Sequence, residues 1–198
     1  MGRPAGVVGA DTLRAIRKAA IARIYEHGFE AMNLRDLAAD VNLRLGSLYN
    51  HVPQKQALLG DLLEGIMQEL LQDLELHMAG LTDPQERLLR FVRFHIEWHT
   101  ARRQEVFIGN MELRSLTPEQ YGRVRELRAR YEAQLRQILS EGKKAGLWTL
   151  DDLRVTTLSL MGMLTGISTW YREEGRLSQQ RLVKLYQKMV MRLLGLPA

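Results

Sequence analysis

Cysteine is absent from the 198-residue sequence, so disulfides, thiolate metal ligands and a thiol nucleophile are excluded. No apolar run reaches the length that a membrane-spanning helix needs. The N-terminus also lacks the apolar core of a signal peptide. These absences predict a cytoplasmic protein that has no membrane partner.

Proline is scarce, with five residues, and no stretch alternates apolar and polar side chains at the period of a β-strand. The dominant residue types, Leu, Glu, Gln, Arg and Ala, favour helices. The sequence has no glycine-rich phosphate loop and no nucleophile elbow, and its scattered Glu and His form no catalytic constellation. We therefore predict an all-α protein that is not an enzyme and carries no cofactor.

Basic residues are in modest excess: 28 Lys and Arg stand against 23 Asp and Glu, which gives a net charge of +5 and a pI of about 9.7. Residues 1–55 hold eight of the basic residues and five of the acidic ones, so the excess is concentrated there. A basic balance suits a polyanionic partner such as nucleic acid. By itself this excess does not identify the partner.

One short stretch, residues 46–52, has two contrasting sides when it is read at helical spacing. The apolar side consists of Leu45, Leu48 and Val52. The opposite side carries Gly46, Ser47, Tyr49 and Asn50. Pro53 ends this helix, because the residue before a proline is driven out of the helical region. A helix of about two turns is unstable alone in water, so neighbouring residues must support it.

The residues before this stretch predict a helix and a turn. Asn33 is a suitable N-cap for a helix that starts at Leu34, and Asp36 lies in its first turn, where negative charge is favoured. Asn42 stands where the turn requires positive φ. The layout is that of a helix-turn-helix, whose first helix crosses the DNA backbone while its second helix enters the major groove.

At these residues the sequence resembles the TetR family of one-component regulators. The resemblance covers roughly residues 12–60 at the family's spacing. It is carried by Ala19-Ala20, Gly28-Phe29, Asn33-Leu34-Arg35-Asp36-Leu37-Ala38, Gly46-Ser47-Leu48-Tyr49-Asn50-His51-Val52 and Lys55-Gln56-Ala57-Leu58-Leu59. The sequence departs from the family pattern at two positions. Arg44 stands where the family usually has a small capping residue before the recognition helix, and Leu45 stands where the family often has a basic or polar residue.

The resemblance and the helix pattern together predict the DNA contacts. For phosphates we predict Asn33, Arg35, Tyr49, His51 and Lys55. For base edges we predict Ser47, Asn50 and Arg44, because an amide pairs doubly with adenine and a guanidinium with guanine. For Arg44 the alternative is a position beside a phosphate, where it adds positive charge. The alternative reading is a solvated polar helix face.

Capping and stop signals divide the rest of the chain into helices, and the predicted N-caps are Asp83, Thr117 and Ser178. Residues 1–10 are predicted to be a disordered arm, in which Arg3 would reach a minor groove. Helices are predicted at about 11–27, 54–78, 84–100, 102–113, 118–144, 149–174 and 178–195. We expect a DNA-binding domain at 1–53 with three helices, and a six-helix ligand-binding and dimerisation domain at 54–198, with 54–78 as the connecting helix.

The second half resembles, more loosely, a TetR subgroup that is often actinobacterial and senses acyl-coenzyme A thioesters or lipid catabolites. The stretches that carry this resemblance are residues 104–107, 111–119 and 170–178. It implies a small hydrophobic effector, such as an acyl-CoA or a fatty acid. Candidate effector contacts are Phe91, Phe94, His95, Trp98, Phe107, Met111, Tyr131, Met161, Leu164, Ile167 and Trp170. Of these, Phe107 and Met111 are predicted to face inward with Val106, and for each candidate plain core packing is the alternative.

Gly162 and Gly166 lie one turn apart within a predicted helix, where each costs about 1 kcal/mol relative to alanine. Close approach of a second copy would compensate, and space for a ligand is the alternative. We favour a homodimer in which the last two helices pair with their copies. The predicted interface residues are Gly162, Gly166, Leu182, Leu185, Tyr186 and Met189.

His95 and His99 have the i, i+4 spacing of a metal-binding pair, but no acidic residue shares their face, so we predict no metal site. The sequence as a whole predicts a ligand-responsive repressor that binds a palindromic double-stranded DNA operator as a dimer. Two alternatives remain at this point. One is a helix-turn-helix protein with a protein-interaction module, and the other is an all-α enzyme.

Overall fold

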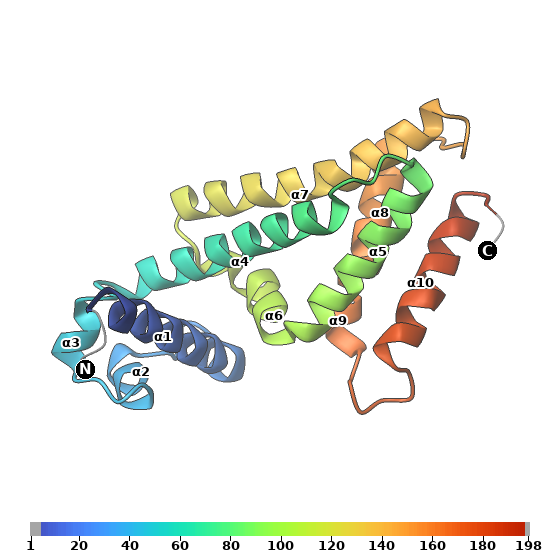
Figure 1. The fold of residues 1–198 in the computed structure, drawn as a ribbon. Coiled ribbons are helices and arrows are strands. Elements are labelled where there is room, and N and C mark those ends of the chain that lie inside the picture. The colour runs from blue at the N-terminus through green and yellow to red at the C-terminus, as the bar shows by residue number, and fades with distance from the viewer. Residues whose placement is uncertain (1–4, 197–198) are drawn as a thin grey trace. The chain divides into compact units, whose positions relative to one another are not determined.

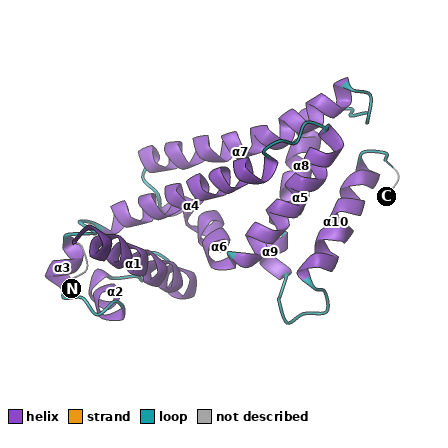
Figure 2. Ribbon diagram, viewed as in Figure 1, coloured by secondary structure: helices purple, strands orange, loops and turns teal. Residues whose placement is uncertain are grey.

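Over residues 5–196, which the computed structural model describes, the chain forms helices and loops without any strand (Figure 1, Figure 2). The prediction of an all-α chain is therefore confirmed. In chain order the elements are α1 (Ala5–His27), α2 (Leu34–Asp40), α3 (Leu45–Tyr49), α4 (Lys55–Met78), α5 (Pro84–Ala101), α6 (Arg103–Met111), the 3₁₀-helix η1 (Glu112–Ser115), α7 (Pro118–Lys144), α8 (Leu153–Thr165), α9 (Ile167–Trp170) and α10 (Gln179–Leu193).

Two compact units make up the chain, and neither is continuous in sequence. The first unit contains the chain up to Ile66 together with Gln104–Val124. The second unit contains Met67–Arg103 together with the chain from Arg125 onward. Helix α4 runs through both units. The boundary therefore differs from the predicted one at residues 53 and 54, since a segment from the middle of the chain joins the N-terminal helices.

In the first unit, α1 contacts α2 and α2 contacts α3. Their shared core consists of Ile16, Ala20, Ile24, Leu37 and Leu48, each at most 1% exposed. Helices α2 and α3 have only seven and five residues, too few to persist alone in water. Burial of these apolar side chains therefore supplies the stability that the short helices lack.

In the second unit, α5 is the central element and contacts α8, α9 and α10. Its inward face carries Leu88, Phe91, Val92 and Ile96, all with 0% exposure. The sequence predicts this burial from the i, i+3 and i+4 spacing of the apolar residues. The same helix also buries two histidines, which are described below.

Side-chain caps begin several helices where the sequence predicts them. The side chains of Asn33, Asp83 and Ser178 each accept a hydrogen bond from the backbone N–H three residues later. Thr117 and Gln120 form a reciprocal capping box at the start of α7: Gln120 N donates to Thr117 Oγ1 at 3.3 Å, and Thr117 N donates to Gln120 Oε1 at 3.1 Å.

The N-terminal arm was predicted to extend to residue 10, and this is wrong, because α1 begins at Ala5. The predicted minor-groove contact of Arg3 lies outside the described residues.

Two predicted helices are divided in the structure. The helix predicted at 149–174 starts later, at Leu153 after the cap Asp152, and is interrupted at Gly166 before α9 ends at Trp170. The helix predicted at 102–113 ends at Met111 and continues as η1. The later start at Leu153 and the change to η1 lie at helix ends, where local sequence patterns are weakest, whereas the break at Gly166 lies inside the predicted helix.

Candidate nucleic-acid interface

The helix-turn-helix has the order of elements that its sequence predicts, but α3 ends at Tyr49, whereas the predicted helix continued to Val52 before Pro53. Asn33 caps α2, with Asp36 N donating to Asn33 Oδ1 at 2.9 Å. The turn after α2 places Asn42 at φ 54°, the left-handed conformation that asparagine tolerates. Helix α3 then follows at Leu45.

Helix α3 separates an apolar side from a polar side. Leu48 and Val52, at 0% and 2% exposure, lie in the core of the first unit. Tyr49 is 45% exposed, and Asn50 is exposed beside it. Ser47 and His51 are exposed as well. The short polar side chains thus form a surface that a groove edge could approach closely.

Arg44 occupies the N-cap position of α3, and its side chain makes no capping hydrogen bond. Its side chain is exposed, as is that of Arg35 on α2. A guanidinium beside the N-terminus of the recognition helix adds positive charge where a phosphate or a guanine edge would lie. At Arg44 the departure from the family pattern is therefore a change from a helix cap to an exposed cation.

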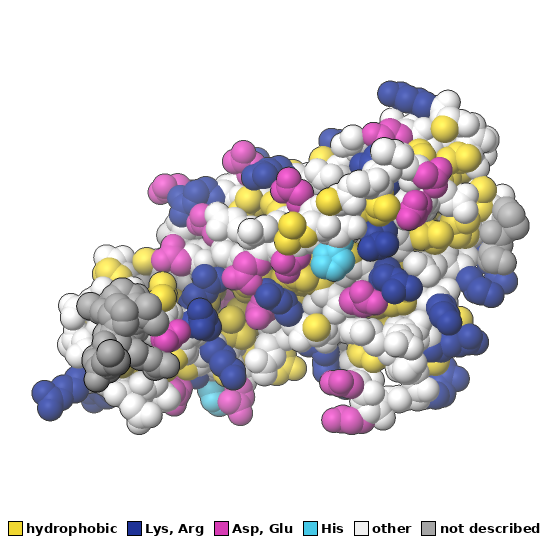
Figure 3. Space-filling model, viewed as in Figure 1, with side chains coloured by type: hydrophobic (Ala, Val, Ile, Leu, Met, Phe, Trp, Pro, Cys, Tyr) yellow, Lys and Arg dark blue, Asp and Glu magenta, His cyan; other side chains and the backbone are white. Residues whose placement is uncertain are grey.

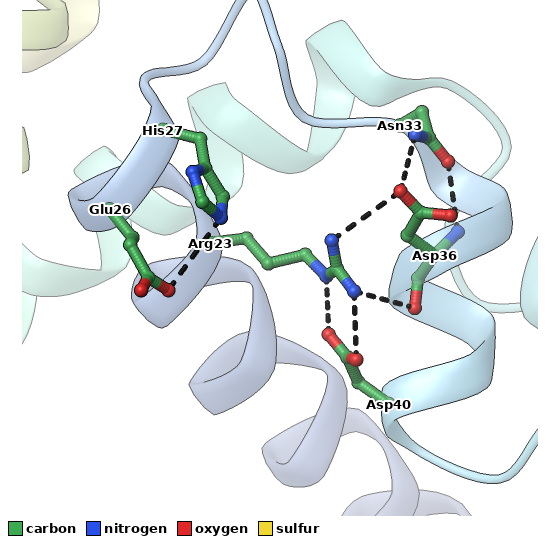
Figure 4. Close-up of polar contacts among 6 residues, drawn as sticks. All are labelled: Arg23, Glu26, His27, Asn33, Asp36 and Asp40. Carbon is green, nitrogen blue, oxygen red and sulfur yellow. Dashed lines mark hydrogen bonds and ion pairs between the residues drawn. The ribbon is translucent and has the colours of Figure 1, made fainter.

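Arg23 joins α1 to α2 through a set of polar contacts (Figure 4). Its guanidinium forms an ion pair with Asp40, with Nη2 donating to Oδ1 at 2.8 Å, and it lies 3.5 Å from an Asp36 carboxylate oxygen. Asn33 Nδ2 donates to Asp36 at 2.6 Å, so the α2 cap belongs to the same network. Hydrogen bonding and the charge of Arg23 lower the pKa of Asp40, and Asp40 raises the pKa of Arg23. No local sequence pattern predicts this network, because its residues come from two helices.

Lys55, a predicted phosphate contact, has a structural partner within the first unit. Its ammonium donates to the carbonyl of Glu30 at 2.9 Å and lies 4.5 Å from the centroid of the Phe29 ring. The charge therefore sits between the loop after α1 and the start of α4. On the face seen in Figure 3, basic side chains are interspersed with acidic ones.

Seven of the eleven predicted effector contacts are buried, and four are not. The buried members are Phe91, Phe94, His95, Trp98, Tyr131, Leu164 and Ile167. Phe107 and Met111 were predicted to face inward, and this is wrong: they are 42% and 50% exposed on α6. Trp170 is 50% exposed, while Met161 is partly exposed. Phe107 instead makes an edge-to-face contact with Tyr25, at 5.1 Å between ring centroids.

His95 and His99 are buried in the second unit with their rings stacked, 3.7 Å apart between centroids. His95 Nδ1 lies 3.0 Å from the Tyr131 hydroxyl, and His99 Nδ1 donates to the carbonyl of His95 at 2.8 Å. Burial lowers the pKa of His99 to about 4 and lowers the pKa of His95 well below its ordinary value. Burial likewise raises the pKa of Tyr131. These rings are neutral hydrogen-bonding groups at pH 7.

A pocket of about 680 Å³ lies within the second unit, between the second half of α4 and α7. Its lining residues are Gln68, Leu71, Gln72, Leu74, Glu75, Met78, Ala79, Leu127, Arg130 and Gln134. None of these was predicted as an effector contact. The mixture of glutamine, leucine and acidic residues along this part of α4 gives no local sign that a concavity will form beside it.

The predicted dimer residues divide into exposed and buried ones. Gly162 is exposed, and no atom outside its own helix backbone lies within 4 Å of where its Cβ would be. Met189 is 47% exposed on α10, and Leu185 is partly exposed. Leu182 and Tyr186, at 1% and 8% exposure, are covered by their own chain. Gly166 is partly exposed at the break between α8 and α9.

The described part of the chain holds neither a metal-binding cluster nor a membrane-spanning helix. Among residues 5–196, no group of three or more His, Cys, Asp or Glu side chains could hold a metal ion. None of the described helices is both long and apolar enough to span a membrane.

Comparison with known proteins gives matches over most of the chain. The family model described as bacterial regulatory proteins, tetR family, matches residues 16–62, and the model described as the tetracyclin repressor-like C-terminal domain matches residues 81–194. The HTH-type transcriptional repressor KstR2 of Rhodococcus jostii (strain RHA1) is 25% identical over 168 residues, covering 84% of this chain and 82% of that protein.

A second relative and one solved structure extend this likeness. KstR2 of Mycobacterium tuberculosis (strain ATCC 25618 / H37Rv) is 26% identical over 195 residues, which cover 96% of both chains. The crystal structure of AibR in complex with isovaleryl coenzyme A and operator DNA superposes with a TM-score of 0.83 at 26% identity, covering 90% of this chain and 97% of that one.

Proposed function

The chain belongs to the TetR family of bacterial regulatory proteins, since family models match residues 16–62 and 81–194, and from this premise we propose a dimeric repressor that a hydrophobic effector releases from DNA. As a member of this family it is a DNA-binding transcriptional regulator and not an enzyme. The effector that we propose is an acyl-CoA or a fatty acid.

The exposed polar side of α3 is the observation that carries the proposal. Tyr49 at the end of α3 and Asn50 directly after it are exposed, while Leu48 on α3 and Val52 in the turn that follows are buried in the core. A recognition helix held in this way presents a constant set of hydrogen-bonding groups to the major groove. Exposed Arg35 and Arg44 flank it and would neutralise phosphates.

A homodimer is supported by apolar residues that this chain leaves exposed on its last helices. Val155 and Leu158 on α8 are 60% and 47% exposed, and Met189 and Leu193 on α10 are 47% and 53% exposed. Gly162 continues the α8 stripe and leaves room for a second helix to approach. Leu182 and Tyr186 would support this surface from behind, as their own chain covers them. Two-fold symmetry would then present two α3 helices to a palindromic operator.

The proposed effector class is supported by the interior of the second unit and by one relative. The Phe91 ring lies beside a neutral His95–Tyr131 pair, at 5.3 Å from Tyr131 between ring centroids, so this pair offers a hydrogen-bonding group inside an apolar region. A thioester or carboxylic acid has an apolar chain and a carbonyl that would match this chemistry. AibR, at 26% identity, was crystallised with isovaleryl coenzyme A.

Three contacts within the second unit join α5, which carries this interior, to α4. Arg102 pairs with Glu69 at 2.5 Å, and Trp98 Nε1 donates to Asp73 at 3.2 Å. His77 packs on Phe94, with 4.9 Å between ring centroids. A shift of α5 on effector binding would therefore move α4, whose first half belongs to the DNA-reading unit. The effector must bind the two arrangements with different affinity, because otherwise no population shifts.

The proposal is tested by selecting bound DNA from a random pool with the purified protein. The operator so obtained is then titrated in the presence of isovaleryl-CoA, palmitoyl-CoA, free palmitate or free coenzyme A. We expect a palindromic operator bound by a dimer, and at least a tenfold loss of affinity with one thioester or fatty acid but not with coenzyme A.

Two variants locate the effector. His95→Leu removes the buried hydrogen-bonding group, and Arg130→Ala alters the pocket between α4 and α7. If the effector no longer releases His95→Leu from the operator but still releases Arg130→Ala, the effector site lies at the aromatic interior around His95. Failure to select any operator contradicts the proposed function, and an operator that none of the lipids releases favours a protein partner instead.

A further inference from the structure

The 112–120 segment comes from the middle of the chain, yet it contacts both ends of the helix-turn-helix within the first unit. At one end is the loop that precedes α2, where Phe29 is 4% exposed. At the other end is the start of α4, where Gln56 lies. These contacts join residues 59 to 83 positions apart in sequence, so they are set by tertiary structure alone.

Glu112 makes the contact at the first end. Its side chain is buried, with 8% of the residue exposed, and the backbone N–H of Phe29 donates to Oε1 at 3.1 Å. Ser115 Oγ donates to the other carboxylate oxygen at 2.7 Å. A buried carboxylate without such donors would be strongly destabilising, so this contact fixes η1 against the loop that follows Gly28.

Gln120 makes the contact at the second end. Its Nε2 donates to the carbonyl of Gln56 at 2.9 Å, and Gln56 Nε2 donates back to Gln120 Oε1 at 2.9 Å. Gln56 Nε2 also donates to the carbonyl of Ser115 at 2.8 Å. The absence of a side chain at Gly60 permits this approach, because a Cβ there would lie 2.4 Å from Gln120 Nε2.

We infer that Glu112 and Gln120 are positioning residues for DNA binding: they hold the two ends of the helix-turn-helix in the orientation that the operator requires. The inference deepens the proposed function, on which it rests. It adds a second route by which the C-terminal half of the chain reaches the DNA-reading helices, because α6 leads directly into Glu112. A movement of α6 would then alter the loop before α2 without passing through α4.

The test uses full-length variants and the operator selected with the wild-type protein. Glu112→Ala removes both acceptors, whereas Glu112→Gln keeps an oxygen for Phe29 N–H and serves as the conservative rescue. Glu119→Ala is the matched control, as Glu119 lies in the same segment with its side chain 85% exposed. We expect at least a tenfold loss of operator affinity in Glu112→Ala, and changes below twofold in the other two.

Hydrogen exchange separates a local effect from unfolding. In Glu112→Ala the Phe29 amide should exchange at least tenfold faster, while the amides of α5 in the second unit exchange as in the wild type. Gly60→Ala is a second variant that does not depend on a buried carboxylate. Alanine favours the α4 helix but displaces the Gln120 amide from Gln56, so the fold should be retained while operator affinity falls at least fivefold.

The outcomes are distinct. If the wild type selects no operator, the proposed function fails and this inference fails with it. If the wild type binds its operator and folded Glu112→Ala and Gly60→Ala bind it equally well or better, the positioning role is overturned while the proposed function stands. Faster exchange at Phe29 with unchanged operator affinity also overturns it, because the contact would then be structural only.

Discussion

The side chain of His99 is neutral in the folded protein at pH 7, since burial lowers its pKa to about 4 from an ordinary value of 6.5. In the unfolded chain this imidazole takes up a proton as the pH falls below 6.5, whereas the folded protein resists protonation until about pH 4. The unfolded state therefore binds more protons between these pH values. As the pH is lowered through this window, the free energy of unfolding decreases. His95, whose pKa is also lowered, acts in the same direction.

We predict that the free energy of unfolding of the second unit falls between pH 6.5 and pH 4, with His99 alone contributing about 3 kcal/mol of the loss. Urea titrations followed by tryptophan fluorescence measure this, because Trp98, Trp148 and Trp170 all lie in the second unit. His99→Phe keeps a stacking ring and should flatten the profile, while His27→Gln, at an exposed position, should not. Equal slopes in wild type and His99→Phe would contradict the pKa assignment.

At the scale of helices, the network around Arg23 fixes α2 to α1 (Figure 4). Arg23→Met keeps the apolar stem and removes the ion pairs with Asp36 and Asp40. We predict a loss of up to about 1 kcal/mol in the stability of the first unit, the usual range for partly exposed ion pairs. A double-mutant cycle with Asp40→Asn, followed by thermal unfolding, isolates the coupling energy.

Arg14→Met supplies the control for that experiment, since Arg14 lies on the same helix with its side chain 80% exposed. It should leave unfolding unchanged. A cycle in which Arg23→Met and Asp40→Asn are additive would mean that the ion pair contributes nothing. The Asp40 pKa is lowered by Arg23, so the coupling should also weaken as the pH falls far enough to protonate that carboxylate.

The elements that the sequence predicts well are those specified by neighbouring residues. Asn33, Asp83 and Ser178 cap helices because a short polar side chain meets a free N–H three residues later, a purely local relation. The burial of Leu48 and Val52 follows from helical spacing. For the same reason the polar side of α3 could be identified from sequence, although its contacts with DNA stay a prediction.

What the sequence does not predict depends on partners distant in the chain. Gly166 interrupts a helix, but a glycine one turn after Gly162 is equally compatible with close helix packing. Phe107 is apolar and yet exposed, and the ring that it contacts belongs to Tyr25 on α1, which is distant from it in sequence. The contact of Glu112 with Phe29 joins residues 83 positions apart, and no local pattern signals it.

At the scale of the whole molecule, the proposed dimer on DNA makes a measurable electrostatic prediction. If Arg35, Arg44 and Lys55 each neutralise one phosphate in both copies, log affinity should fall against log salt with a slope near −5. Arg44→Ala should make the slope shallower by about 2 for the dimer. Lys144→Ala removes the same charge from an exposed position in the second unit and should leave the slope unchanged.

Operator affinity measured by fluorescence anisotropy at several salt concentrations gives these slopes. A flat response would contradict all three phosphate assignments. A slope shallower by one third would point to Lys55, because its ammonium already donates to the carbonyl of Glu30.

The joining of residues 104–124 to the N-terminal helices has a consequence for protein engineering. A gene cut after the recognition helix would encode a fragment that lacks the acceptor for the Phe29 amide and the amide partner of Gln56. A chimaeric regulator built by grafting that fragment onto a foreign sensor would have to transplant residues 104–124 as well. In this protein the two units are interleaved along the gene, so neither can be exchanged by a single cut in the sequence.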